Sequence, residues 1–476
     1  MQPLLLSGLS AFLFSLLLTP VCRTIFRRLG IFDCPTENRK IHDRPIPRVG
    51  GVVLVVSLAA AYAVTRLFGG VDLGAGAALE LAVKVFPGAA VIFVVGLLDD
   101  LISLRPWQKL GGQLVGAAWA YWSGVRVIGA AGYSAESWLT LPLTLFWLVL
   151  CTNAFNLIDG VDGLATGVAL FGTLTTMVAA IMQHNFALVA VTLPLVGFLL
   201  GFLRYNFNPA TVFLGDSGSL LLGFLLGCFG VIWSQKSATL LGMTAPLMAM
   251  FVPLLDVGLS VLRRFLRHQP IFGADRGHIH HRLLDRGMTP RRAVLLLYGV
   301  CSLGAIVSLL QTTVHQQYSG LIVLLFCASA WIGIQHLGYV EFNLASRMLL
   351  AGSFQRMLDM QIRLRKFEQA LAATLTTDDC RQVIKDACQT FGFSGVIVSF
   401  RDYEFREDLP GADLDARWTI RIPLGDRDYV NIMRPFDSAE QSLSLVPLVE
   451  ILRKRLPAKL DSLALNRERV MAHSAN

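Results

Sequence analysis

The sequence has few charged side chains for its length. Lys, Arg, Asp and Glu make up 16% of the 476 residues, whereas a soluble globular domain has about 25%. The shortage is uneven, because half of the charged side chains fall in residues 343–476. This composition excludes a single soluble domain. It predicts a polytopic membrane domain followed by a smaller water-soluble domain.

Several sequence signatures are absent. None of the eight cysteines forms a C-x-x-C pair, which argues against a disulfide framework or a zinc site. We find no Lys/Arg-rich arm and no nucleic-acid motif, so the net charge of +8 does not indicate a nucleic-acid partner. The first apolar run, Leu4–Val21, has no basic residue before it and no small-residue cleavage site. We expect a retained helix there, not a signal peptide.

Eleven apolar segments have the length and hydropathy of membrane spans, which take about 20 residues. They lie near 4–22, 50–67, 83–98, 110–127, 139–156, 166–182, 186–203, 217–234, 239–262, 293–310 and 318–336. Lys and Arg are concentrated in every second loop between these segments. Up to residue 292, the loops on one side of the membrane contain 18 of them. The other side has four: Arg66, Lys84, Arg126 and Lys236. The positive-inside rule then places the N-terminus outside and the C-terminal part in the cytoplasm. We expect the chain to lie in the inner (cytoplasmic) cell membrane.

The polar clusters between these segments all fall on the cytoplasmic side in this orientation. A transporter or flippase of lipid-linked sugars would instead carry polar residues at mid-membrane depth. The distribution favours an enzyme that takes a lipid from the bilayer and a second substrate from the cytosol. A signalling protein whose C-terminal part does the work is a third alternative.

The segment Gly96–Lys109, "GLLDDLISLRPWQK", places two acids at the mouth of a predicted span. Phosphoryl transfer on diphosphates depends on positioning and charge neutralisation. We therefore expect Asp99 and Asp100 to lie near a lipid phosphate and Lys109 to hold it. The two acids could handle a proton or only position the substrate.

Polar residues recur at every third position of "NAFNLIDGVDG", which contains Asn156, Asp159 and Asp162. The glycines after both acids predict a loop that approaches a ligand, although an ordinary polar turn would also fit. In "YNFNPATVFLGDSGS", Asp216 is either a helix cap or an oxygen ligand of Mg²⁺ together with Asn156. Phe213 is either core or a ring that stacks on a base.

Two basic segments complete the set. The first, "DRGHIHHRLL", contains His278, His280 and His281, which favour a cradle for diphosphate and sugar over a zinc site. The second, Asp33–Gly51, is a proline-containing loop with Lys40 and His42, which could hold phosphate. The positive-inside rule alone explains the basic residues of this loop nearly as well.

These segments, in this order, resemble the polyprenyl-phosphate N-acetylhexosamine-1-phosphate transferase family over about residues 1–340. "NAFNLIDGVDGLATG", "NPATVFLGDSGSLLLG" and "DRGHIHHRLL" carry the resemblance. It implies an all-α polytopic membrane fold and transfer of a sugar-1-phosphate from a UDP-sugar to a polyprenyl phosphate, with release of UMP. It also implies Mg²⁺, for which Mn²⁺ could substitute. "RKIHDRPIPRVGG" favours the undecaprenyl-phosphate GlcNAc branch, with phospho-MurNAc-pentapeptide transferase as the alternative.

The resemblance also implies roles for single residues. Asn156 and Asp216 correspond to the metal ligands, Phe213 to the ring that stacks on uracil, and Asp162 to a uracil contact. The catalytic group comprises Asp99, Asp100, Lys109 and His280. The substrate-binding group comprises Asp159, Asp162, Lys40, His42, His278, His281, Arg282 and Phe213.

The C-terminal part departs from this family pattern. A 3-4 apolar spacing in residues 341–376 predicts a linker helix, which is either the stalk of a homodimer or packed on its own domain. Residues 377–476 predict a small α+β domain with a helix at 378–390, strands in "GVIVSF", "WTIRI" and "DYVNIM", and a helix near 445–456. The order of these elements resembles a GAF-like sensory fold.

Overall fold

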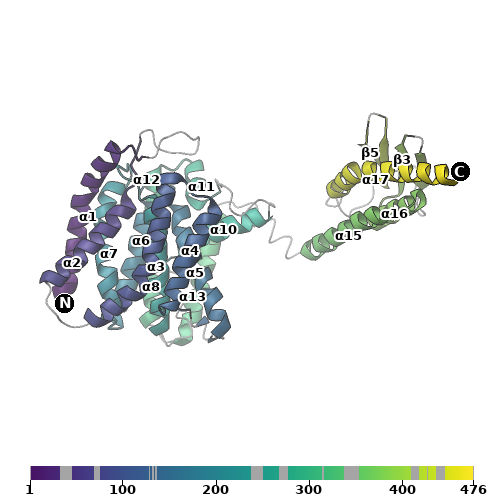
Figure 1. The fold of residues 1–476 in the computed structure, drawn as a ribbon. Helices are drawn as coiled ribbons and strands as arrows, with labels where there is room; N and C mark the ends of the chain where they lie inside the picture. Colours follow the sequence, from purple (N-terminus) through teal and green to yellow (C-terminus); the bar gives the residue numbers. More distant parts are fainter. Residues whose placement is uncertain are drawn as a thin grey trace. The chain divides into compact units, whose positions relative to one another are not determined.

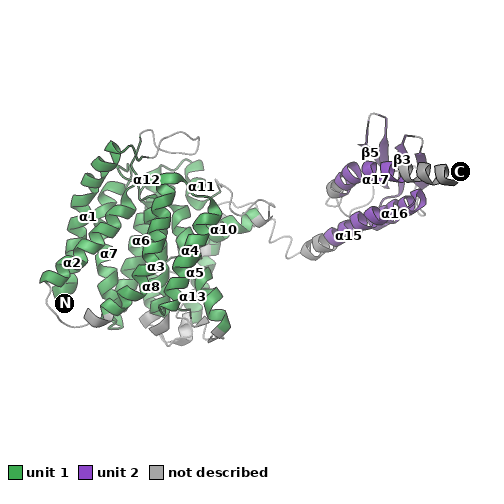
Figure 2. Ribbon diagram, viewed as in Figure 1, with its two compact units in different colours: residues 1–339 green, residues 340–476 purple. Residues whose placement is uncertain are grey.

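The structure is a computed structural model of the chain. It describes residues 2–32, 45–68, 75–127, 129–130, 133–134, 137–236, 250–266, 277–313, 316–336, 353–401, 403–408, 417–425, 427–435 and 445–474. Lys40 and His42 lie outside the described residues. The chain divides into two compact units, residues 1–339 and residues 340–476 (Figure 2), and each is described by itself.

The first unit is a bundle of helices (Figure 1). Its helices are α1 (Gln2–Arg28), α2 (Gly50–Phe68), α3 (Ala75–Ile102), α4 (Pro106–Trp122), α5 (Ser137–Ile158), α6 (Leu164–Met182), α7 (Phe186–Asn206), α8 (Gly215–Lys236), α10 (Phe251–Leu266), α11 (Ile279–Asp285), α12 (Pro290–Thr313) and α13 (Gln316–His336). A short antiparallel hairpin, β1 (Gly129–Ala130) and β2 (Tyr133–Ser134), precedes α5.

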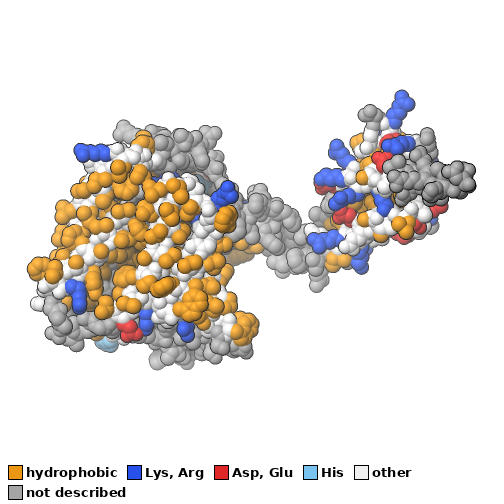
Figure 3. Space-filling view, viewed as in Figure 1, with side chains coloured by type: hydrophobic (Ala, Val, Ile, Leu, Met, Phe, Trp, Pro, Cys, Tyr) orange, Lys and Arg blue, Asp and Glu red, His pale blue; other side chains and the backbone are white. Residues whose placement is uncertain are grey.

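Eight of these helices are long and apolar enough to cross a membrane: α1, α2, α3, α5, α6, α7, α8 and α12. The predicted count of eleven spans is not confirmed. Two of the predicted segments correspond to shorter helices. α4 has 17 residues, and α10 has 16 and begins at Phe251, whereas the predicted segment begins near residue 239. α13 occupies the last predicted segment. Apolar side chains cover most of the face of this unit seen in Figure 3, and Lys and Arg lie toward its two ends.

α8 forms the centre of the bundle, since 94% of its apolar stretch is buried. Glycines let neighbouring helices approach it closely. A Cβ atom on Gly223 would lie 2.4 Å from the Cys151 carbonyl oxygen of α5, and one on Gly96 would lie 2.5 Å from Ser217 Cα. Small residues at helix contacts are the usual way to gain van der Waals packing in a lipid environment. They hold the start of α8 against the end of α3.

Local sequence explains why several helices begin or end at one end of the bundle. Pro106 occupies the first position of α4, where its missing N–H costs no hydrogen bond. Gly163 (φ 80°) precedes α6, and Gly215 (φ 75°) is the first residue of α8. These left-handed backbone conformations favour glycine. The polar residues at these junctions are thereby collected at one end of the bundle.

The second unit has a four-stranded antiparallel sheet with the order β4-β3-β6-β5. Its elements are α15 (Ser353–Ala373), α16 (Thr377–Thr390), β3 (Gly395–Phe400), β4 (Tyr403–Asp408), β5 (Arg417–Pro423), β6 (Tyr429–Pro435) and α17 (Leu445–Ser474). In the central register, Val398 lies opposite Phe405 on one side and Val430 on the other. α15 buries Phe367 and Leu371 in the core of this unit, so it packs on its own domain.

Candidate active site

Lys109 joins two acidic residues that are far apart in the sequence. Its ammonium nitrogen forms an ion pair with Asp99 Oδ2 and lies 2.5 Å from Asp216 Oδ2. Asp99 lies in the last turn of α3, and Lys109 and Asp216 lie in the first turns of α4 and α8, so three helix ends meet at this point. The second oxygen of Asp99 accepts a hydrogen bond from the Leu104 backbone at 2.7 Å. One cation therefore bridges two partly buried carboxylates and offsets one of their two negative charges.

Asp100 holds the first turn of α8. Its carboxylate accepts hydrogen bonds from the backbone N–H groups of Asp216 and Ser217, both at 2.9 Å, and from the Ser217 hydroxyl at 2.7 Å. Arg48 Nη1 lies 3.8 Å from the same carboxylate. The first N–H groups of a helix lack intrahelical partners, and here an acid from another helix satisfies them. Two roles were predicted for Asp100, proton handling and positioning. This arrangement suits positioning.

Asn156 and Asp216 are in contact, as the sequence requires if both are to hold one metal ion. The Asn156 side chain lies close to the Asp216 carboxylate and donates a hydrogen bond to the Ser219 hydroxyl at 3.0 Å. No group of three or more His, Cys, Asp or Glu side chains in the described ranges is arranged to hold a metal ion. A bound ion would therefore also draw on an amide oxygen, waters and substrate phosphates. Mg²⁺ is bound in this way.

The local charge balance also suits a hard cation. Asp159 follows α5, and burial together with the negative charges of Asp216 and Asp100 raises its pKa well above the usual range. Four carboxylates, those of Asp99, Asp100, Asp159 and Asp216, thus interact here with the cations Lys109 and Arg48. With Asp159 protonated, the other three carboxylates exceed these two cations by one negative charge, which suits a cation with oxygen ligands.

Asp162 connects the loop after α5 to the loop before α8. Its Oδ2 accepts hydrogen bonds from the Asn208 side chain at 3.0 Å and from the Ala210 backbone at 2.9 Å. In the same loop, Phe213 forms a parallel bridge with Arg48, and its carbonyl accepts a hydrogen bond from Gly50 at 3.0 Å. The Phe213 ring is half-buried. Their predicted roles as nucleobase contacts stay predictions.

The histidine segment lies beside the Asp159–Gly163 loop. A Cβ atom on Gly160 would lie 3.0 Å from His280 Nε2, so glycine allows this approach. His280 is 2% exposed, and burial lowers its pKa to about 3. A buried neutral imidazole adds no positive charge to an anion cradle. His281 and Arg282 are half-buried, so they are better placed to meet an anion than His280 is.

Asp256 of α10 orients this segment. Its Oδ2 lies 3.0 Å from His278 Nδ1 and 4.0 Å from His280 Nδ1, and its Oδ1 accepts a hydrogen bond from the Ile279 backbone at 2.7 Å. The rings of His278 and His280 are parallel, with centroids 5.6 Å apart. Sequence reasoning missed Asp256, although an isolated acid in the apolar segment "FVPLLDVGLS" was a usable signal.

Other contacts at the site were also missed. Gln113 and Asn153 form paired side-chain hydrogen bonds of 2.6 and 3.3 Å between α4 and α5. Ser217 and Ser219 hold Asp100 and Asn156, respectively. These contacts join helices that are distant in sequence. They cannot be predicted from the sequence of any single apolar segment.

Comparisons with known proteins find a family model and several relatives that match the first unit. The family model of glycosyl transferase family 4 matches residues 82–234, a range that contains Asp99, Lys109, Asn156 and Asp216. The chain is 35% identical over 288 residues to a Bacillus subtilis protein named "Probable undecaprenyl-phosphate N-acetylglucosaminyl 1-phosphate transferase", covering 60% of this chain and 78% of that protein.

Two further relatives carry related names. The chain is 31% identical over 335 residues to the decaprenyl-phosphate N-acetylglucosaminephosphotransferase of Mycobacterium tuberculosis, covering 64% of this chain and 82% of that protein. It is 35% identical over 270 residues to the phospho-N-acetylmuramoyl-pentapeptide-transferase of Streptococcus suis, covering 51% of this chain and 76% of that protein.

Proposed function

The chain belongs to glycosyl transferase family 4, and on this premise we propose that it transfers N-acetylglucosamine-1-phosphate from UDP-N-acetylglucosamine to a polyprenyl phosphate. The products are a polyprenyl diphosphate-linked sugar and UMP. The named relatives act on undecaprenyl or decaprenyl phosphate with N-acetylglucosamine. The reaction would be the first membrane step in the synthesis of a cell-surface glycan.

The junction of Lys109 with Asp99 and Asp216 carries the proposal. Three helix ends hold a cation between acids at one end of an apolar bundle, where a lipid phosphate and a water-soluble nucleotide would meet. An oxygen of the lipid phosphate attacks the β-phosphorus of the UDP-sugar, and the bond between that phosphorus and the bridging oxygen breaks. UMP leaves with the bridging oxygen, so atoms and charge balance.

The chain's own residues would position the two substrates and neutralise the charge of their phosphates. The ammonium group of Lys109 would bind the lipid phosphate in exchange for part of its contact with the acids. Asp100 would keep the first turn of α8 fixed, and Asp216 with it. Mg²⁺, when bound to Asp216 and Asn156, would neutralise the charge of the diphosphate. Phe213, Asp159 and Asp162 would bind the uridine, and His281 and Arg282 the sugar diphosphate.

We further propose that the chain lies in the inner membrane with its N-terminus outside and this site facing the cytoplasm. The excess of Lys and Arg in the loops at the site end supports this orientation. Residues 340–476 would then also be cytoplasmic. A homodimer is a further proposal, but the 3-4 apolar face of α15 does not supply its interface, because Phe367 and Leu371 lie in the core of their own unit.

A second candidate is transfer of phospho-MurNAc-pentapeptide, because the chain is also 35% identical to an enzyme with that name. That match covers 51% of this chain, against 60% and 64% for the two relatives whose names include N-acetylglucosamine. Their larger share of the chain is the observation that favours the N-acetylglucosamine donor.

The test uses the purified full chain with Mg²⁺ and undecaprenyl phosphate. UDP-GlcNAc, UDP-GalNAc and UDP-MurNAc-pentapeptide are offered in turn, and UMP release and label transfer to lipid are measured. We expect both signals with UDP-GlcNAc and neither with Asp216→Ala. Label transfer only from UDP-MurNAc-pentapeptide would establish the second candidate. Sugar-lipid movement without UMP would indicate a transporter.

A further inference from the structure

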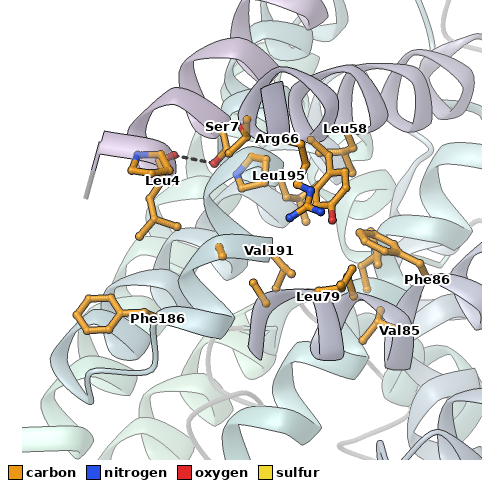
Figure 4. A pocket seen from close by; sticks show the side chains of 18 of the residues that line it. Leu4, Ser7, Leu58, Arg66, Leu79, Val85, Phe86, Phe186, Val191 and Leu195 are labelled. Carbon is orange, nitrogen blue, oxygen red and sulfur yellow. Dashed lines mark hydrogen bonds between the residues drawn. The ribbon is translucent and has the colours of Figure 1, made fainter. Parts of the chain in front are cut away.

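A cavity of about 450 Å³ lies in the first unit, away from the candidate active site. Its lining includes Leu4 of α1, Leu58 of α2, Leu79 and Phe86 of α3, and Phe186 and Leu195 of α7 (Figure 4). Gly50 of α2 contacts the active-site end of α8, and Arg66 of the cavity is 16 residues further along the same helix. At 1.5 Å per residue the two ends are about 24 Å apart.

The serine and threonine hydroxyls in the lining of this cavity already have partners. The Ser7 hydroxyl donates to the Leu4 carbonyl at 2.7 Å, and the Thr65 hydroxyl donates to the Ala61 carbonyl at 2.8 Å. Both hydroxyls are thus used within their own helices. Polar binding groups remain at Arg66, whose side chain extends toward the cavity from α2 in Figure 4, and at Tyr62.

Arg66 differs from Lys84 and Arg126, two other basic residues of its side. Lys84 is paired with Glu80 at 2.6 Å. Arg126 donates to the Tyr121 carbonyl at 3.1 Å, and its guanidinium group lies 4.7 Å from the centre of the Tyr121 ring. No acid within the described ranges pairs with Arg66, which is exposed in the last turn of α2. An unpaired guanidinium group at the mouth of an apolar cavity matches a ligand with a hydrocarbon chain and an anionic head.

We propose that this cavity binds one acyl chain of an anionic phospholipid, whose phosphate is held by Arg66. An arginine side chain near a helix end reaches the depth of lipid headgroups, and its planar guanidinium group pairs well with phosphate oxygens. A volume of about 450 Å³ falls within the usual range for ligand sites. The lipid substrate is a poor occupant, because its phosphate is needed at Lys109 in the other leaflet. Only this exclusion of the lipid substrate rests on the proposed function.

The test compares lipids that differ only in headgroup charge. The delipidated full chain is titrated with phosphatidylglycerol or phosphatidylcholine, both with oleoyl chains, and bound lipid is counted by native mass spectrometry. We expect phosphatidylglycerol to bind at least about tenfold more tightly. Arg66→Ala should remove this preference, and Lys84→Ala, a paired cation on the same side, should keep it. The midpoint of thermal unfolding of each variant checks that it has folded.

A second variant tests the cavity itself. Leu79→Trp places a large ring at an exposed part of the lining, and we expect it to weaken the binding of both lipids. The proposal is overturned if the wild-type chain binds the two lipids equally, or if Arg66→Ala keeps the preference. It is also overturned if Leu79→Trp raises only the KM for long-chain polyprenyl phosphate, because the cavity would then hold the far end of the lipid substrate.

Discussion

Lys109 Nζ lies 2.5 Å from Asp216 Oδ2, although the two residues are 107 positions apart. The same ammonium group contacts Asp99. The ends of α3, α4 and α8 are thereby held together by one cation. Removing that cation would leave partly buried carboxylates facing each other, which is unfavourable. Lys109 thus has two roles: it stabilises the packing of the three helix ends, and it is the cation proposed to bind the lipid phosphate.

Replacing Lys109 tests its role as the phosphate-binding cation. We expect Lys109→Gln to lower kcat/KM for UMP release by about 100-fold or more, the usual cost of losing a preorganised charge at a reacting group. Lys109→Arg should recover part of the rate because it keeps the charge. Lys84→Gln serves as the control, since Lys84 pairs with Glu80 at the other end of α3. Equal rates for Lys109→Gln and the wild-type chain would exclude the role.

The proposed metal ligands can be tested without turnover. Mg²⁺ that binds only the folded chain should raise the midpoint of thermal unfolding, by about 2.7 kcal/mol of stabilisation at 100 times its Kd. We expect Asp216→Asn and Asn156→Ala to lose this Mg²⁺-dependent shift, and a chelator to abolish it in the wild-type chain. Asp285→Asn, an exposed acid of α11, should retain it. A full shift in Asp216→Asn would mean that the ion binds elsewhere.

Much of the fold could be predicted because the apolar runs are long and the strands are rich in β-branched residues. α16 confirms the helix predicted at 378–390, and β3 matches "GVIVSF". The strand β4, "YEFRED", was missed because its sequence is largely charged. It lies at one edge of the sheet, where charged side chains are common since they discourage pairing with other chains. The local pattern therefore favoured a loop.

The site was predictable only as separate segments. "DD", "NAFNLIDGVDG" and "GDSGS" each mark a polar helix end, and the resemblance assigned them to one site. The partners that hold them were not visible. Asp100 caps a helix 116 residues away, and Asp256 binds a histidine 22 residues away. Such contacts depend on which helix ends meet in the bundle, and this information is not contained in the period of any single segment.

Asp256 gives a test of positioning. We expect Asp256→Asn to lower kcat about tenfold with a smaller change in KM, because His278 loses a charged hydrogen-bond partner while Ile279 keeps an acceptor. Adding His278→Ala to Asp256→Asn should lower kcat little further, since both changes remove the same interaction. Losses that multiply in the double variant would show that the two residues act separately.

The cap of α16 offers a test in the second unit. The Thr376 hydroxyl accepts a hydrogen bond from the Asp379 backbone at 3.1 Å, and Asp379 accepts one from the Thr376 backbone at 3.0 Å. We expect Thr376→Ala to cost about 1 kcal/mol. Amide hydrogen exchange of residues 377–390 in the full chain should then be about fivefold faster. Thr377→Ala keeps both hydrogen bonds of the cap and should change exchange little. Unchanged exchange in Thr376→Ala would show that packing alone holds α16.

The buried His280 predicts how stability depends on pH. Its pKa in the folded chain is about 3, below the unfolded value of about 6.5. A lowered histidine pKa means that the neutral ring stabilises the fold fully above pH 6.5, and that this contribution is lost as the pH falls toward 3. From pH 7 to pH 5 the free energy of unfolding should fall by about 2 kcal/mol from this group. Thermal unfolding in detergent at the two pH values measures the change. His280→Gln should flatten the pH dependence, whereas His184→Asn, at an exposed position, should not. A slope that His280→Gln leaves unchanged would mean that other groups take up the protons.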